Sequence, residues 1–204
     1  MTALGVLALL GTAVFAVSGA LQALRQGMAV VGVSYNAAVT GVGGGTVRDV
    51  LLGATPVGWV REPTDLIVCV ACAVAVSAFN RALTGARLAW LLYADAAGLA
   101  LFAVLGAAKA ADADAHPFVC VLFGAMSATF GGIIRDVICN EEPVLFRKEI
   151  YVTAALFGSG VYVATPRGLE IAGVDAGLLI GLAAALALRV LAMRRGWSLP
   201  FPRY

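Results

Sequence analysis

The sequence predicts an all-α integral membrane protein of seven transmembrane helices, arranged as an inverted three-plus-three repeat followed by a seventh helix. Two observations favour this fold. The 204-residue chain is 61% hydrophobic and only 13% charged, whereas soluble domains carry about 25% charged residues. Its first half also resembles its second half at a constant offset of 87 residues. The composition excludes a soluble enzyme, and a net charge of +2 gives no reason to expect a nucleic-acid partner.

Seven stretches are apolar enough to be membrane spans, each of which needs about 20 mostly apolar residues. None shows the alternation of a β-barrel strand, so each is expected to be helical. The stretches cover residues 1–24, 26–47, 66–80 (extending towards 83), 88–108, 115–134, 150–166 and 176–188. We expect one membrane domain over 1–204, with repeats at about 1–84 and 88–168 and the seventh helix at about 173–195.

Basic residues in the connecting segments predict the orientation of the chain. Apart from Arg48 and Arg135, which are expected within the membrane, one side carries eight basic residues and the other carries three. The eight are Arg25, Arg81, Arg87, Arg147, Lys148, Arg194, Arg195 and Arg203, and the three are Arg61, Lys109 and Arg167. Because cytoplasmic loops are enriched in Lys and Arg, we expect the N-terminus outside and the C-terminus in the cytoplasm.

The internal repeat is clearest in two copies of the motif G-G-x-x-R-D. Residues 44–49 carry the first copy, and residues 131–136 carry the second, 87 positions later. Further pairs at this offset are Gly11 with Gly98, Phe15 with Phe102, Gly19 with Gly106, and Pro56 with Pro143. Since three spans is an odd number, the second repeat must enter the bilayer from the opposite side. Inverted halves of this kind place a transport pathway at their interface.

The glycines of the motif are expected to interrupt the second and fifth spans. Each glycine within a helix costs about 1 kcal/mol relative to alanine, and positions 41 and 43–45 are all glycine. Thr46 would then cap a restarted helix, with Asp49 in its first turn. A break in lipid is stable only against protein or a wet cavity. Carbonyl oxygens freed at the two breaks would offer ligands to a cation near mid-membrane.

Three ionisable residues that are expected within the membrane, Arg48, Arg135 and Asp95, point to the same region. An intramembrane arginine costs at least about 2.5–3.5 kcal/mol and usually faces a cavity or a partner. We expect Asp95 to pair with Arg48 or Arg135, or to line a wet cavity. The alternatives are arginines that cap helix ends at the interface and an interfacial Asp95. Unpaired arginines would repel cations from a narrow pore, so Asp49, Asp136 or Asp95 should neutralise them.

The candidate pathway residues are these charged groups, the motif glycines and nearby hydroxyl side chains. They are Thr40, Gly43, Gly44, Gly45, Arg48, Asp49, Asp95, Ser127, Thr129, Gly131, Gly132, Arg135 and Asp136. Hydroxyl residues in membrane helices more often bond the backbone, but Thr40 and Ser127 match at the repeat offset. The glycines of the first and fourth spans are expected to be close-packing positions. No nucleophile–base set or metal-ligand cluster is found in the spans, so no enzymatic activity is expected.

The doubled motif in a seven-span chain resembles the prokaryotic trimeric intracellular cation (TRIC) channel family. G-V-G-G-G-T-V-R-D at 41–49 and F-G-G-I-I-R-D at 130–136 carry the resemblance, which covers nearly the whole chain. It implies a homotrimer in a prokaryotic plasma membrane, with one pore in each protomer. It also implies K⁺ as the permeant ion. No cofactor is expected, and the partners expected are the lipid bilayer and the other protomers.

The bacterial family domain is also labelled a glycine transporter, so a carrier for glycine or another small zwitterion is the alternative. Both functions would use a mid-membrane site between inverted halves, and the arginines and half-helix N-termini suit a carboxylate. A chain of 204 residues is small for a carrier monomer with a moving barrier. A structural subunit without a pathway would leave the doubled buried arginines unexplained.

Overall fold

The computed structural model describes residues 3–79, 87–146, 150–166, 168–171 and 174–198, which are almost entirely helical. Each predicted span overlaps one of the longer helices. In chain order the elements are α1 (Ala3–Arg25), α2 (Val30–Leu51), α3 (Gly58–Arg61), α4 (Thr64–Ala78), α6 (Arg87–Asp112), α7 (Pro117–Ile138), η1 (Val144–Phe146), α8 (Val152–Ala164), β1 (Glu170–Ile171), β2 (Val174–Asp175) and α9 (Ala176–Arg195). The two strands form one short antiparallel hairpin before α9.

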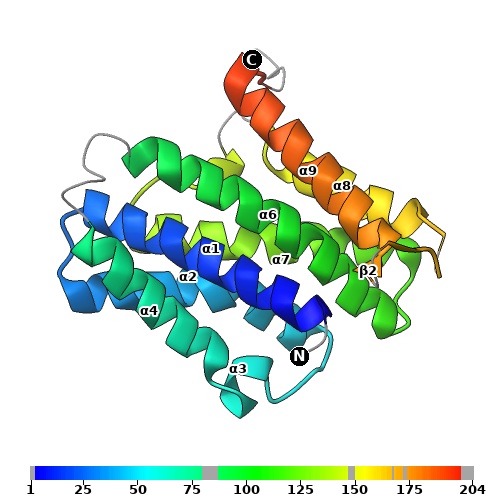
Figure 1. Cartoon of the computed structure of the whole chain (residues 1–204), viewed down its shortest axis with the longest axis horizontal. Helices are drawn as coiled ribbons and strands as arrows, with labels where there is room; N and C mark the ends of the chain where they lie inside the picture. Colours follow the sequence, from blue (N-terminus) through cyan, green and yellow to red (C-terminus); the bar gives the residue numbers. More distant parts are fainter. Residues whose placement is uncertain (1–2, 80–86, 147–149, 167, 172–173, 199–204) are drawn as a thin grey trace.

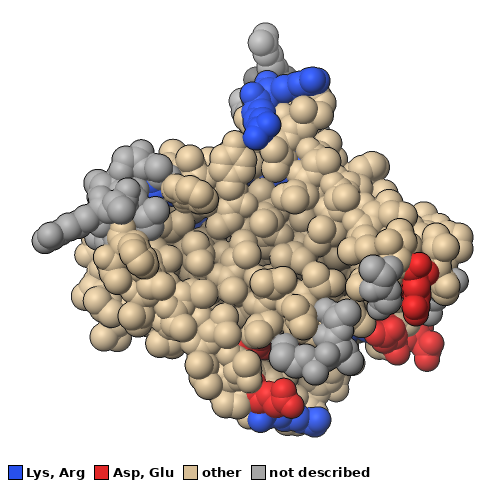
Figure 2. Space-filling model, in the orientation of Figure 1, with Lys and Arg blue, Asp and Glu red and all other residues tan. Residues whose placement is uncertain are grey.

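The outer surface fits a lipid environment. Within the described residues, α1, α6, α7 and α9 are long and apolar enough to cross a membrane, and α4 and α8 are shorter apolar helices. Large apolar side chains face outward, among them Val31, Ile67 and Phe118. Figure 2 shows a broad face without charged side chains, with the Lys, Arg, Asp and Glu residues gathered at its margins. So extensive an exposed apolar surface is unsuited to water.

Helices α1 and α6 form an antiparallel pair at the centre of the bundle, with α4 on one side and α8 and α9 on the other (Figure 1). A Cβ atom on Gly98 would overlap the ring of Phe15, and one on Gly11 would lie 3.0 Å from the ring of Phe102. The two rings stack with their centroids 5.3 Å apart. The expectation that these glycines allow close helix packing is confirmed.

Helices α2 and α7 form the second central pair, and they show that the predicted helix breaks are wrong. Both helices run without interruption through Gly43–Gly45 and Gly131–Gly132. Thr46 does not cap a new helix, because its hydroxyl donates to the carbonyl oxygen of Val42, 2.7 Å away within the same helix. Carbonyl groups that were expected to be free for a cation therefore lie within continuous helices.

The glycines serve instead to bring the two backbones into contact. A Cβ atom on Gly44 would overlap the carbonyl oxygen of Ser127, and one on Gly131 would lie 2.5 Å from the carbonyl oxygen of Thr40. Position 44 faces 127 and position 40 faces 131, so α2 and α7 are antiparallel. The local cost of glycine in a helix is outweighed here by a close helix crossing of the kind that small residues permit.

Local geometry recurs at the offset of 87 residues. Helix α2 begins and ends 87 positions before α7. Positive φ angles occur at Gly27 and again at Asp114, and at Gly53 and again at Asn140. Helix α9 stands outside this pattern and packs against α6 and α8. These regularities, with the antiparallel central pairs, support the interpretation of two inverted repeats and an additional helix.

Candidate functional site

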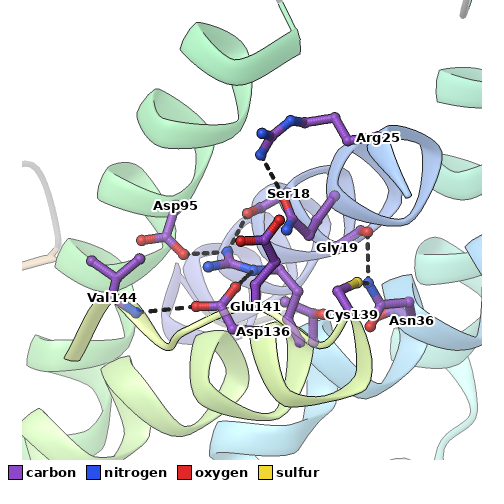
Figure 3. Close-up of polar contacts among 12 residues, drawn as sticks. Ser18, Gly19, Arg25, Asn36, Asp95, Asp136, Cys139, Glu141 and Val144 are labelled. Atoms are coloured by element: carbon purple, nitrogen blue, oxygen red, sulfur yellow. Dashed lines mark hydrogen bonds and ion pairs between the residues drawn. The ribbon is translucent and has the colours of Figure 1, made fainter. Parts of the chain in front are cut away.

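One cluster of charges is buried around Arg135, near the C-terminal end of α7. Figure 3 labels its partners Ser18, Asp95 and Asp136. The Nη1 atom of Arg135 donates to Asp95 Oδ1 of α6 at 2.5 Å and to Ser18 Oγ of α1 at 2.6 Å, and its Nε atom donates to Asp136 Oδ1 at 2.8 Å. Asp136 Oδ2 also accepts from the backbone N–H of Val144, at 3.2 Å. Three helices thus converge on one guanidinium, and η1 contacts its carboxylate partner Asp136.

The predicted pairing of Asp95 with one of the two arginines is confirmed, and the partner is Arg135. Only 1% of Arg135, 1% of Asp95 and 4% of Asp136 is exposed. Buried ions are tolerated only when they are paired and hydrogen-bonded, as they are here. The three side chains carry two carboxylates and one guanidinium, so together they have an excess negative charge.

A second cluster surrounds Asp49 near the C-terminal end of α2. Its Oδ1 atom accepts from Arg48 Nε at 2.8 Å and lies 2.9 Å from the Nζ atom of Lys109. Lys109 comes from the last turn of α6 and also donates to Asp49 Oδ2 at 3.0 Å. The Lys109 side chain is 42% exposed. The Asp49 cluster is therefore accessible from the surface through Lys109, whereas the Arg135 cluster is enclosed by protein.

Three adjoining cavities, together called the vestibule, lie beside the Asp49 cluster. Their volumes are about 190, 320 and 590 Å³, and Ala8 of α1 lines all three. Other lining residues are Gly5, Gly45, Arg48, Asp65 and Lys109. The vestibule therefore leads from the surface between α1, α4 and α6 to the charged end of α2.

The predicted hydroxyl residues lie in the α2–α7 contact region or near it. Thr40 donates to the Asn36 carbonyl at 2.6 Å, and Thr129 donates to the Ala125 carbonyl at 2.8 Å. Ser127 Oγ faces Gly106, and within the described residues it has no hydrogen-bond partner. Gly43 faces Ile134 of α7 across the same contact. The contribution of these residues to a pathway stays a prediction.

Sequence reasoning did not select Lys109, Ser18, Tyr151 or Arg189 as site residues. Lys109 was assigned to a connecting segment because the uncharged stretch ends at residue 108, but α6 continues to Asp112. Arg189 is 1% exposed, and an arginine within the apolar run of α9 was the available signal for it. Arg81, Arg147, Lys148, Arg167 and Arg203, which the predicted orientation also uses, lie outside the described residues.

Comparisons with known proteins agree with this architecture. The family described as "Glycine transporter" matches residues 5–81 and again residues 92–167, once in each half of the chain. A crystal structure of the TRIC trimeric intracellular cation channel orthologue from Rhodobacter sphaeroides is 42% identical, with a TM-score of 0.88, and covers 97% of this chain and 100% of that one. This chain belongs to the TRIC channel family. The resemblance seen in the doubled motif is thereby confirmed.

Two further relatives of this TRIC family member extend the comparison. A prokaryotic TRIC channel crystallised in 0.5 M KCl is 32% identical, with a TM-score of 0.89 over 96% of this chain and 98% of that one. The UPF0126 inner membrane protein YadS of Escherichia coli K12 is 39% identical over 198 residues, which are 96% of this chain and 93% of YadS. The relatives are channels and membrane proteins, so the predicted membrane location is confirmed.

Proposed function

We propose that this protein is a K⁺-conducting cation channel, assembled as a homotrimer with one pathway in each protomer. Residues 1–204 would form one domain of two inverted repeats and a seventh helix, with every long helix crossing a prokaryotic plasma membrane and the N-terminus outside. Permeant K⁺ and lipid are the only bound molecules proposed. The observation that carries the proposal is the whole-chain similarity, at 42% identity, to the Rhodobacter sphaeroides TRIC trimeric intracellular cation channel orthologue.

The pathway is proposed to pass the α2–α7 crossing between the two charge clusters. Arg48 follows Gly44 by four residues, and Arg135 follows Gly131 by four. At a rise of about 1.5 Å per residue, each arginine lies about 6 Å along its helix from the crossing. Because the helices are antiparallel, the two clusters lie on opposite sides of it. The vestibule would admit ions to the Asp49 side, and the Arg135 cluster would form the narrow side.

The charges along this route favour cations. Both arginines have a carboxylate partner, at 2.8 Å in each case, so neither presents an uncompensated positive charge. The charged residues that line the vestibule are Arg48, Arg61 and Lys109 against Asp49, Glu62, Asp65 and Asp112. This excess of carboxylates raises the local concentration of cations.

The decisive experiment is a transport assay on the purified protein in vesicles of phosphatidylethanolamine and phosphatidylglycerol. We expect K⁺ flux, and unitary currents in planar bilayers, without uptake of radiolabelled glycine. Saturable glycine uptake without unitary currents would replace the channel by the carrier. The structural similarity does not favour that alternative, because the matched structures are those of channels.

Replacing Asp49 with asparagine is expected to reduce K⁺ conductance about tenfold. The substitution leaves Arg48 and Lys109 together at the vestibule without their shared carboxylate, and two cations would repel K⁺. Conductance and the reversal potential in a KCl gradient measure the effect. Lys109→Gln is the matched control, because it removes a positive charge and should hold or raise the conductance. A fall in both variants would contradict the electrostatic role of Asp49.

A further inference from the structure

The two arginine clusters occupy equivalent positions in the repeats but differ in what fills the space beside them. A Cβ atom on Gly45 would lie 3.5 Å from Arg48 Nη2, and one on Gly132 would lie 3.6 Å from Arg135 Nη2. The backbone notch is therefore the same in both repeats. Beside Arg48 the notch borders a cavity of about 190 Å³ that Gly45 and Ala8 line.

Two side chains occupy the corresponding place beside Arg135. The position of a Gly132 Cβ atom lies 2.8 Å from the hydroxyl of Tyr151 and 3.4 Å from Asp95 Oδ1. At the repeat offset, Asp95 replaces Ala8 and Tyr151 replaces Thr64 of the first repeat. Larger residues at these two positions thus fill a space that is hollow in the other half.

Tyr151 is not held beside Gly132 by a hydrogen bond of its hydroxyl. The side chain is 2% exposed, and within the described residues its hydroxyl has no hydrogen-bond partner. A buried hydroxyl without a partner is unfavourable, so the position of the ring has another cause. The ring belongs to a buried apolar cluster that also contains Phe15, Leu99 and Val144.

Arg189 of α9 contacts the ring of Tyr151. Its guanidinium carbon lies over the Tyr151 ring, 5.1 Å from the centroid, and its Nη1 atom donates to the carbonyl oxygen of Ile150 at 3.0 Å. A cation over an aromatic face is attracted to it, most strongly where water is excluded. Helix α9 has no counterpart in the repeat, so this contact is specific to the Arg135 side.

We propose that the ring of Tyr151 closes the pathway at the Arg135 cluster and that Arg189 is the residue that positions it. This inference rests on the proposed cation channel. Displacement of the ring would leave a notch bordered by Asp95 and Arg135, equivalent to the open notch beside Arg48. The excess carboxylate of the cluster would then face the opened space and favour a cation.

The test is Tyr151→Thr, which places the residue of the first repeat at this position. Tyr151 precedes the first residue of α8, where threonine is a favourable capping residue. We expect the open probability in planar bilayers to rise about tenfold, as for a closed state that loses the interaction favouring it, at unchanged unitary conductance. Tyr162→Thr is the matched control, because Tyr162 lies within α8 and packs near Gly177 and Gly181 of α9. It should leave the open probability unchanged.

Two further variants separate the ring from its hydroxyl and from Arg189. Tyr151→Phe should keep the channel closed, because the hydroxyl has no partner within the described residues. Arg189→Met should raise the open probability, and adding it to Tyr151→Thr should give no further increase, since it acts through the ring. If Tyr151→Thr does not fold, the open probability of Arg189→Met tests the proposal, and no increase in that variant would contradict it.

Each outcome bears on one proposal. No cation current in the unmodified protein would overturn the channel itself. Current in the unmodified protein with no increase in Tyr151→Thr, or an equal increase in Tyr162→Thr, would overturn only the role of Tyr151. Closure lost in Tyr151→Phe would assign the effect to the hydroxyl and would contradict closure by the ring.

Discussion

Replacing Arg135 with leucine is expected to destabilise the protein by about 3–5 kcal/mol, the range found when one partner of a buried ion pair is removed. The substitution leaves the carboxylates of Asp95 and Asp136 without the guanidinium that both contact. Asp95 and Asp136 are 1% and 4% exposed, so water cannot replace the lost guanidinium. A thermal unfolding scan in detergent should show a decrease on the order of 10 °C.

Arg48→Leu is the matched control, because it makes the same change in the first copy of the motif. Asp49 would keep Lys109, 2.9 Å away, and the cluster borders the vestibule. A loss of about 1 kcal/mol or less is expected, because Asp49 keeps a cation partner whose side chain is 42% exposed. Equal destabilisation by both substitutions would show that Lys109 does not compensate Asp49 when Arg48 is lost.

Adding Asp95→Asn to Arg135→Leu should restore part of the stability. The double variant buries one unpaired carboxylate where Arg135→Leu buries two, so the two changes are not additive. Asp95→Asn alone should also alter conduction, because it removes the excess negative charge of the cluster. Unchanged conduction in this variant would exclude Asp95 from the pathway.

The positions of the helices could be predicted from the distribution of charged residues, but their ends could not. The second stretch was expected to end at Val47, since Arg48 is the next charge. The helix continues to Leu51 because Asp49 compensates Arg48 and is itself held by Lys109. Lys109 is 60 positions away from Asp49, so counting charges along the chain cannot find it.

The sequence predicted which residues belong to the site more readily than which of them contact one another. The sequence identified Asp95, Arg48 and Arg135 as interacting residues, but the choice between the two arginines depends on the antiparallel packing of α1 and α6. That packing places Asp95, near the start of α6, beside Ser18, towards the end of α1, and both contact Arg135. Tyr151 gave no sequence signal, because a tyrosine beside a helix start is ordinary at a membrane interface.

The predicted helix breaks failed because only the local cost of glycine was considered. Gly44 and Gly131 each touch a carbonyl oxygen of the partner helix, of Ser127 and Thr40 respectively. Those contacts join residues more than 80 positions apart. Helix propensity describes a single segment and contains no information on such a contact.

Gly44→Ala is expected to disrupt the α2–α7 crossing and to cost about 1–3 kcal/mol or more, as for an overpacked core. Its Cβ atom would overlap the carbonyl oxygen of Ser127, which belongs to the backbone of α7 and cannot move alone. Gly131→Ala should behave alike, because its Cβ atom would lie 2.5 Å from the carbonyl oxygen of Thr40. Thermal unfolding and K⁺ flux measure both variants.

Gly45→Ala is the control within the same motif, and its expected effect has the opposite sign. The nearest atom to its Cβ is Arg48 Nη2, at an ordinary contact distance of 3.5 Å. Because alanine favours the helix over glycine by up to about 1 kcal/mol, this variant should be as stable as the unmodified protein or more so. An interrupted helix would instead need glycine at 45, so a large loss in Gly45→Ala would restore the broken-helix interpretation.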